Sequence, residues 1–115
     1  MKKRRIEAFV LMIDAYFLNE MQRIVSLASQ SSLPGVYGFR EYVEAGGLIG
    51  YGLSYRDYYK GVARYVDKVL KGTKPADLPV AQPTKIGLAI NLASANALGL
   101  TIPQPLLLRA DEVIQ

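Results

Sequence analysis

The stretch that decides the fold is residues 36–54, which read VYGFREYVEAGGLIGYGLS. Val36 to Phe39 is an apolar run that predicts a short strand. Arg40 to Ala45 predicts a short helix that stops at Gly46-Gly47, and Leu48 to Tyr51 predicts the next strand. Strand and helix alternate with short connections, which is typical of a Rossmann-like α/β fold with a parallel sheet and right-handed crossovers.

The same alternation extends toward the N-terminus. Ala8 to Ile13 is a compact apolar run without a helical stripe, so it predicts a buried strand of the kind found in parallel sheets. Asn19 to Ser31 follows, and its apolar residues recur at helical spacing. Asn19 is the expected N-cap of this helix, with Gln22 three positions on.

Toward the C-terminus, the clearest helix of the sequence begins at Ser54. Asp57 lies at nearly the capping-box spacing, an apolar stripe runs to Leu70, and Gly72 ends the helix. The remaining expected elements are a proline-rich irregular connection over Lys74–Thr84, a strand over Ile86–Leu92, a short helix capped by Asn91 or Ser94 that stops at Gly99, and a last turn or helix over Leu106–Ile114.

Composition narrows the possible functions. A chain of 115 residues suits one domain over residues 1–115, and 50% hydrophobic with 21% charged residues is an ordinary globular balance. Cysteine and histidine are both absent, which excludes Cys/His zinc sites and Ser-His-Asp or Cys-His catalysis within the chain. We therefore expect no metal, no cofactor and no enzymatic activity.

The basic residues gather at the start of the chain. Much of the net charge of +4 comes from Lys2 to Arg5, so no basic face for nucleic acid is expected elsewhere. This cluster and the apolar residues after it superficially resemble a signal peptide, but Glu7 and Asp14 interrupt the apolar run and no small-x-small cleavage site follows. No stretch is long enough for a transmembrane helix.

Ligand-binding candidates follow the strands. In a parallel sheet, ligands lie off the carboxyl ends of the strands. Five residues occupy such ends, namely Asp14 and Tyr16 after the first strand, Phe39 and Arg40 at the second, and Tyr51 at the third.

Each of these candidates has a structural alternative. Asp14 could instead cap a turn or helix. Arg40 could clamp a ligand carboxylate through two hydrogen bonds, or it could form a surface ion pair with Glu44 at i,i+4. The eight tyrosines, four of them between residues 55 and 65, suit core packing or an aromatic binding wall. The glycines of residues 46–52 match no phosphate-loop pattern, so we interpret them as a helix stop and close backbone packing.

Several segments together resemble one family. Residues 42–52 (YVEAGGLIGYG) and 65–80 (YVDKVLKGTKPADLPV) are similar to ABC-transporter substrate-binding proteins of the type that serves tryptophan, tyrosine and similar solutes. The runs 82–85, 90–92 and 97–103, with Leu107 to Ile114, fit the same family. The resemblance extends from about Ala8 to the end of the chain.

The resemblance implies a type I periplasmic-binding fold, in which two Rossmann-like lobes close over a solute. Members are considerably longer, so it implies that this chain is the C-terminal part of a two-lobe protein. It also implies a small organic solute such as an amino acid, an ABC permease as partner of a complete and exported protein, and a periplasmic location. Because no signal peptide is expected in this chain, a cytoplasmic location is the alternative.

One lobe alone would leave sheet edges and apolar surface uncovered, so we expect a homodimer or a strand-exchanged oligomer. The competing interpretation is a truncated structural protein that associates with itself and has lost solute binding. A small α/β enzyme is disfavoured because the chain lacks histidine, cysteine and a nucleophile elbow.

Overall fold

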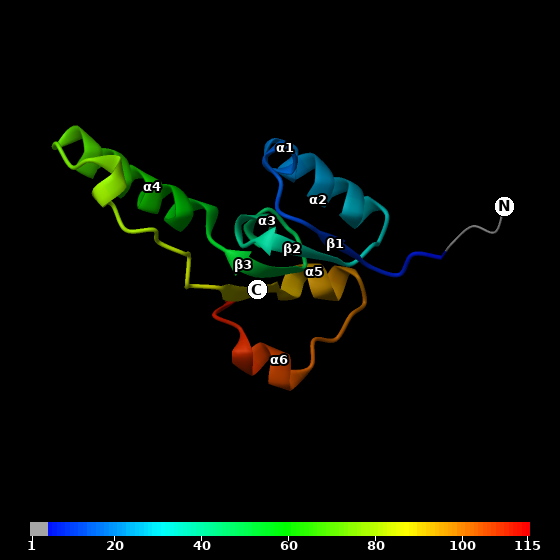
Figure 1. The fold of residues 1–115 in the computed structure, drawn as a ribbon. Coiled ribbons are helices and arrows are strands. Elements are labelled where there is room, and N and C mark those ends of the chain that lie inside the picture. The colour runs from blue at the N-terminus through cyan, green and yellow to red at the C-terminus, as the bar shows by residue number, and fades with distance from the viewer. Residues whose placement is uncertain (1–4) are drawn as a thin grey trace.

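Five strands form one mixed sheet in the order β1-β2-β3-β4-β5 (Figure 1). The computed structural model describes residues 5–115, and most of the basic cluster therefore lies outside the described residues. The strands are β1 (Phe9–Leu11), β2 (Gly35–Phe39), β3 (Ile49–Leu53), β4 (Gly87–Asn91) and β5 (Glu112–Ile114). The pairs β1–β2, β2–β3 and β4–β5 are parallel, which confirms the predicted α/β fold class.

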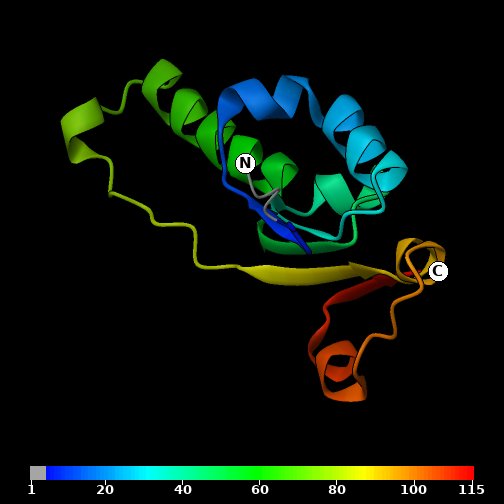
Figure 2. The ribbon, with the colours of Figure 1, turned by 90° about the vertical axis from the view of Figure 1, so that its right-hand side faces the viewer.

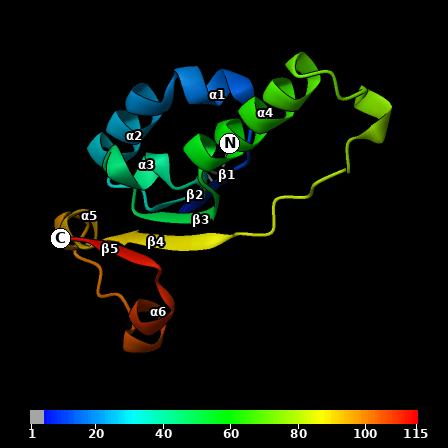
Figure 3. The same ribbon diagram turned by 90° about the vertical axis from the view of Figure 1, so that its left-hand side faces the viewer.

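Helices connect the strands. They are α1 (Ala15–Asn19), α2 (Met21–Gln30), α3 (Glu41–Glu44), α4 (Tyr55–Leu70), α5 (Leu92–Ala97) and α6 (Gln104–Arg109), with a 3-10 turn over Pro75–Asp77. Figure 3 shows α1, α2 and α3 on one side of the sheet and α6 on the other. The main core lies beneath α2 and α3, where Val25, Tyr37, Phe39 and Tyr42 are buried together.

The pairing of β3 with β4 corrects the prediction of an all-parallel sheet, because these two strands are antiparallel. A crossover helix that packs on the sheet returns the chain to the edge from which the strand began. Here α4 instead points away from the sheet, and residues 71–86 bring the chain back to the edge where β3 ended (Figure 2). The sequence pattern predicts α4 but carries no information on where that helix packs.

The N-terminal elements also differ from their predicted bounds. The first strand covers only Phe9–Leu11, and Val10 is 67% exposed, so this strand is not buried as expected. Asn19 does not cap a helix, because it is the last residue of α1. Instead the Oδ1 atom of Asp14 accepts a hydrogen bond from the Tyr16 amide at 2.8 Å and caps α1.

Two corrections concern β3 and the C-terminus. Tyr51 lies in the middle of β3 and not at its end, because the strand continues to Leu53. The last segment is not one turn or helix, since α6 ends at Arg109 and β5 follows. Asp111, directly before β5, makes two hydrogen bonds to the backbone of Leu88. The Asp111 amide donates to the Leu88 carbonyl at 2.8 Å, and the Leu88 amide donates to the Oδ2 atom of Asp111 at 2.7 Å.

The opposite face of the sheet stays largely open over the first three strands. Phe9 and Leu11 pack toward the core, whereas Val10 alternates to the other face. Tyr51 is 62% exposed on β3. Parallel sheets are normally covered on both faces, so this face has the character of a contact surface.

The molecule is elongated. Its radius of gyration is 17.5 Å and its principal extents are 57 × 38 × 21 Å, against about 13 Å expected for a compact domain of about 100 residues. The excess comes from α4 and residues 71–86, which project from the sheet in all three ribbon views (Figures 1 to 3). Within residues 5–115, no helix is long and apolar enough to cross a membrane.

Candidate functional site

The carboxyl edge of β2 and β3 is built around one glutamate. Glu41 opens α3, directly after β2 and Arg40. Its Oε1 atom accepts hydrogen bonds from the Ser54 hydroxyl at 3.0 Å and the Arg56 amide at 3.2 Å. Its Oε2 atom accepts from the Tyr55 amide at 3.0 Å. One side chain from α3 thus holds the first backbone donors of α4, which have no partner within the helix.

Local sequence and tertiary contact cap α4 together. The Ser54 hydroxyl accepts from the Asp57 amide at 3.3 Å, as its N-cap position predicts. The pKa of the Glu41 carboxyl lies below its ordinary value. Burial raises this pKa, but the hydrogen bonds from the Tyr55 and Arg56 amides and from the Ser54 hydroxyl together lower it by more. The carboxylate form therefore holds the start of α4.

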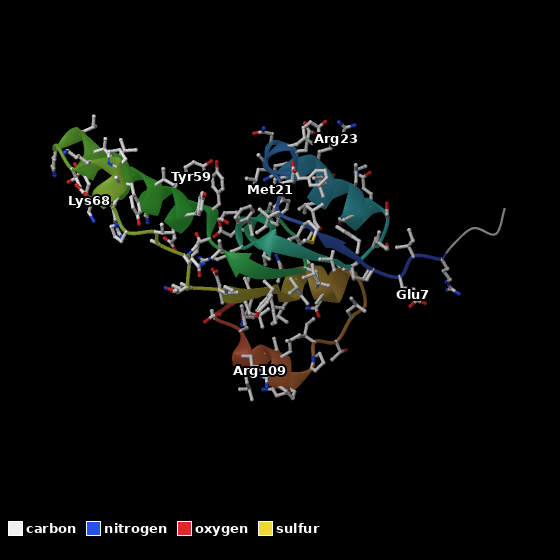
Figure 4. All side chains as sticks on the ribbon, in the orientation of Figure 1. Glu7, Met21, Arg23, Tyr59, Lys68 and Arg109 are labelled. Atoms are coloured by element: carbon white, nitrogen blue, oxygen red, sulfur yellow. The ribbon has the colours of Figure 1, made fainter. Side chains whose placement is uncertain are left out.

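A row of aromatic rings runs from the core along α4. The Phe39 ring meets the Tyr55 ring edge-on at 5.9 Å between centroids, and Tyr55 lies 4.5 Å from Tyr59. Tyr58 packs against Tyr59 at 5.5 Å. Tyr58 and Tyr59 are 48% and 52% exposed, so the row passes from the core to the surface. Figure 4 places Tyr59 along α4, with Lys68 farther from the sheet.

Asp14 and Tyr16 lie at the carboxyl end of β1. The carboxylate of Asp14 caps α1, as the structural alternative proposed. The pKa of the Tyr42 hydroxyl lies above its ordinary value, raised first by burial and second by the negative charge of Asp14. Tyr16 is 69% exposed and contacts the Phe17 ring edge-on at 6.1 Å, so its hydroxyphenyl group is open to a ligand.

Phe39 and Arg40 lie at the end of β2 but are engaged by other residues. Phe39 is 7% exposed and contributes to the core. The Arg40 guanidinium lies 2.6 Å from Glu112 and 3.5 Å from Glu44. The ion pair with Glu44 is thus present, and a ligand carboxylate would have to compete with two protein carboxylates. The Oε2 atom of Glu112 is buried and accepts no hydrogen bond within the described residues, so its contact with the Arg40 guanidinium is an ion pair.

Tyr51 does not join the other candidates. The adjacent Gly50 faces α3, since a side chain there would meet Val43 and Arg40. Side chains alternate along a strand, so Tyr51 lies on the opposite face of the sheet from Arg40. The structure therefore gathers Asp14, Phe39 and Arg40 on the α3 side and separates Tyr51 from them.

Two hollows contain none of the five predicted residues. The larger, of about 620 Å³, is an open groove between the first half of α4 and residues 81–85. Tyr58, Tyr65, Lys60 and Arg64 are among its lining residues, and the Tyr65 hydroxyl donates to the Pro79 carbonyl at 2.6 Å. The smaller, of about 360 Å³, lies between α2, α5 and the amino ends of β2 and β3. Among the described residues, no group of acidic, cysteine or histidine side chains is arranged to hold a metal ion.

Sequence reasoning missed Glu41 and Glu112. Nothing next to Glu41 in the sequence indicates its role, because its partners Ser54 to Arg56 lie 13 to 15 residues further along the chain. Glu112 was placed in a terminal turn or helix, and its contact with Arg40 exists only because β5 joins the sheet. The four tyrosines between residues 55 and 65 are the sequence signal that indicates the aromatic row.

The chain is similar to one protein family in its sequence and to several solved structures in its fold. A family model described as ABC transporter substrate binding protein matches residues 1–114. No curated protein matches the chain. A crystal structure of a conserved domain protein from Vibrio cholerae is similar over 93% of this chain, with 29% identity and a TM-score of 0.81.

Two further structures are similar. One is the ABC domain from Streptococcus pneumoniae in complex with L-Trp, with 32% identity over 94% of this chain and a TM-score of 0.81. The other is an open, ligand-free substrate binding protein with adhesive properties from Clostridium difficile, at 21% identity and a TM-score of 0.56, which shows likeness of fold alone. The chain spans 36–37% of the length of these structures.

Proposed function

Since its sequence matches the family model over residues 1–114, the chain belongs to the ABC transporter substrate binding proteins, and we propose that it contributes to binding a small organic solute such as an amino acid. The chain acts without chemistry of its own in this proposal. The streptococcal structure that holds L-Trp supports the choice of solute class.

The observation that carries the proposal is the carboxyl edge of the sheet. Asp14, Tyr16 and Arg40 lie there, and the aromatic row leads from Phe39 to the exposed Tyr59. Carboxylate, guanidinium and aromatic groups are suited to the ammonium, carboxylate and side chain of an amino acid. We propose that Phe39 supports the aromatic row from within the core. We propose that Tyr51 provides contact surface on the opposite face of the sheet.

We further propose that residues 1–115 are the C-terminal part of a two-lobe protein. The short span relative to similar structures supports this division. Two lobes that close over a solute bury it from both sides, so one lobe alone would bind weakly. An ABC permease as partner, a periplasmic location and a homo-oligomer of this chain belong to the same proposal.

Calorimetric titration tests solute binding. We expect heat of binding with L-tryptophan or L-tyrosine, and we expect Arg40→Ala to weaken it because the guanidinium would no longer face the solute carboxylate. D-tryptophan, which inverts the configuration at the α-carbon, and tryptamine, which lacks the carboxylate, are the matched controls. Absence of binding to aromatic and aliphatic amino acids at millimolar concentration would contradict solute capture by this chain.

A second candidate function is self-association without solute binding. The exposed apolar residues of α4 favour it, because Val62, Val66 and Leu70 are 42%, 51% and 81% exposed. A chain that associates strongly and responds to no amino acid would support this alternative over the first.

A further inference from the structure

The part of the molecule around α4 is joined to the sheet by two neighbouring strands. The chain leaves the sheet after Leu53 and re-enters it at Gly87. The last paired residues at this edge are two glycines, Gly52 and Gly87. Both connections therefore leave the sheet side by side, and no side chains pack across the last pair.

Beyond its first turn, α4 has little else to fix its direction. Within residues 5–115 it has no extensive contact with another helix or strand. Figures 2 and 3 show it extending away from the sheet together with residues 71–86. The far half is tied by the hydrogen bond of Tyr65 to Pro79, but that bond lies within the projecting part and does not connect it to the sheet.

The start of α4 is different, because Glu41 binds it to the body of the protein. Both carboxylate oxygens are used, on two successive amides and on the Ser54 hydroxyl. The backbone that carries Glu41 is anchored in the core, because the neighbouring Tyr42 and Val43 are 2% and 0% exposed. A two-oxygen contact with successive donors restrains orientation as well as position.

We infer that Glu41 is a positioning residue that sets the direction in which α4 leaves the sheet. The Glu41 carboxylate acts as a strap that ties α3 to the start of α4, at residues 54–56. Without this contact, α4 stays attached to the body of the protein through the Phe39–Tyr55 contact, the exposed ion pair of Arg56 with Glu44 at 3.6 Å and the two chain connections. In the proposed solute-binding role, on which this consequence rests, the strap would set the aperture between the sheet edge and the elements around α4.

Distance measurement between two spin labels tests the inference without any solute. The chain contains no cysteine, so labels can be placed at Gln22→Cys on α2 and Leu70→Cys at the end of α4. We expect one narrow distance distribution for the otherwise native chain. Glu41→Ala should broaden and shift it, and Glu41→Gln should give an intermediate width because one oxygen can still accept.

Glu44→Ala is the matched control. Glu44 lies on the same short helix and carries the same charge, but within residues 5–115 its carboxylate pairs with the exposed guanidinium groups of Arg40 and Arg56 and accepts no backbone hydrogen bond from α4. Its loss should leave the distribution unchanged. Should Glu41→Ala fold poorly, Ser54→Ala removes one of the same hydrogen bonds at smaller cost.

The inference is wrong if Glu41→Ala and Ser54→Ala, measured well below their unfolding temperatures, keep the native distance distribution. It is also wrong if Glu44→Ala broadens the distribution as much as Glu41→Ala does. If Glu41 only stabilised the fold, Glu41→Ala would lower the unfolding temperature without changing the distance distribution. The distances are measured without solute, so they test the inference even if the calorimetric titration shows no binding. The inference and the proposed function can therefore fail separately.

Discussion

At the scale of the residue, a buried amide joins three elements. Asn91, 6% exposed, ends β4 and caps α5 through its Oδ1 atom, which accepts from the Ser94 amide at 3.0 Å. Its Nδ2 atom donates to the Val43 carbonyl at 3.2 Å. The Ser94 hydroxyl donates to the Gly46 carbonyl at 2.8 Å. Two side chains therefore satisfy the backbone of α3 and of the turn that follows it.

Replacement of Asn91 by alanine should be costly. The start of α5 loses its side-chain cap, and the buried Val43 carbonyl keeps only its hydrogen bond from the Gly46 amide at 3.1 Å. The free energy of unfolding should therefore fall by about 1–3 kcal/mol. Urea denaturation measures the loss. Asn96→Ala, on the same helix but exposed, is the control and should change stability little. Equal effects of the two substitutions would show that the amide of Asn91 does not hold these elements together.

At the scale of the element, a glycine in β3 has no room for a side chain, whereas a glycine in α4 has open space around it. A methyl group on Gly52 would overlap the carbonyl oxygen of Gly38 in the neighbouring strand, where the register between β2 and β3 shifts. Gly61 lies inside α4, and a methyl group there would meet nothing within 4 Å. The first glycine is thus required by close backbone packing, whereas the second weakens its helix.

Alanine at these two positions should act in opposite directions. Gly61→Ala should raise the free energy of unfolding by about 0.5–1 kcal/mol, because glycine costs more backbone entropy in a helix than alanine. Gly52→Ala should lower it by about 1–3 kcal/mol through overpacking. Thermal unfolding of both variants beside the native chain measures the changes. A destabilised Gly61→Ala would mean that another surface packs closely against α4 at this point.

At the scale of the whole molecule, apolar surface is unevenly distributed. One side of the sheet carries the core, while Val10 and Tyr51 lie exposed on the other. The projecting α4 exposes Tyr59, Val62 and Val66. Contiguous exposed apolar surface of this kind marks a contact region, and the elongated shape places α4 where a second molecule can reach it.

The chain should therefore associate with itself as its concentration rises. Sedimentation velocity over a concentration series should give an increasing sedimentation coefficient. Val66→Glu should reduce the increase, because it places a charge in the apolar stripe of α4. Thr73→Glu adds the same charge in an exposed position beyond the helix and serves as the control. A sedimentation coefficient independent of concentration would contradict self-association.

The class of fold, most of the elements and the family follow from the sequence alone. The strand at residues 35–39, the helix at 55–70 and its cap at Ser54 were predictable because each depends on residues within a few positions of one another. The sequence left Asn91 and Ser94 as alternative caps of the next helix, and the structure has Asn91. The candidate residues Asp14 and Arg40 were found in the same way, from their place directly after a strand.

How these elements meet depends on contacts between distant parts of the chain. The antiparallel pairing of β4, the joining of β5, the face on which Tyr51 lies and the three hydrogen bonds of Glu41 all depend on where the chain returns after α4. Local patterns record which side of an element is apolar. They do not record which distant segment covers that side, because that choice is made by packing between residues far apart in the chain.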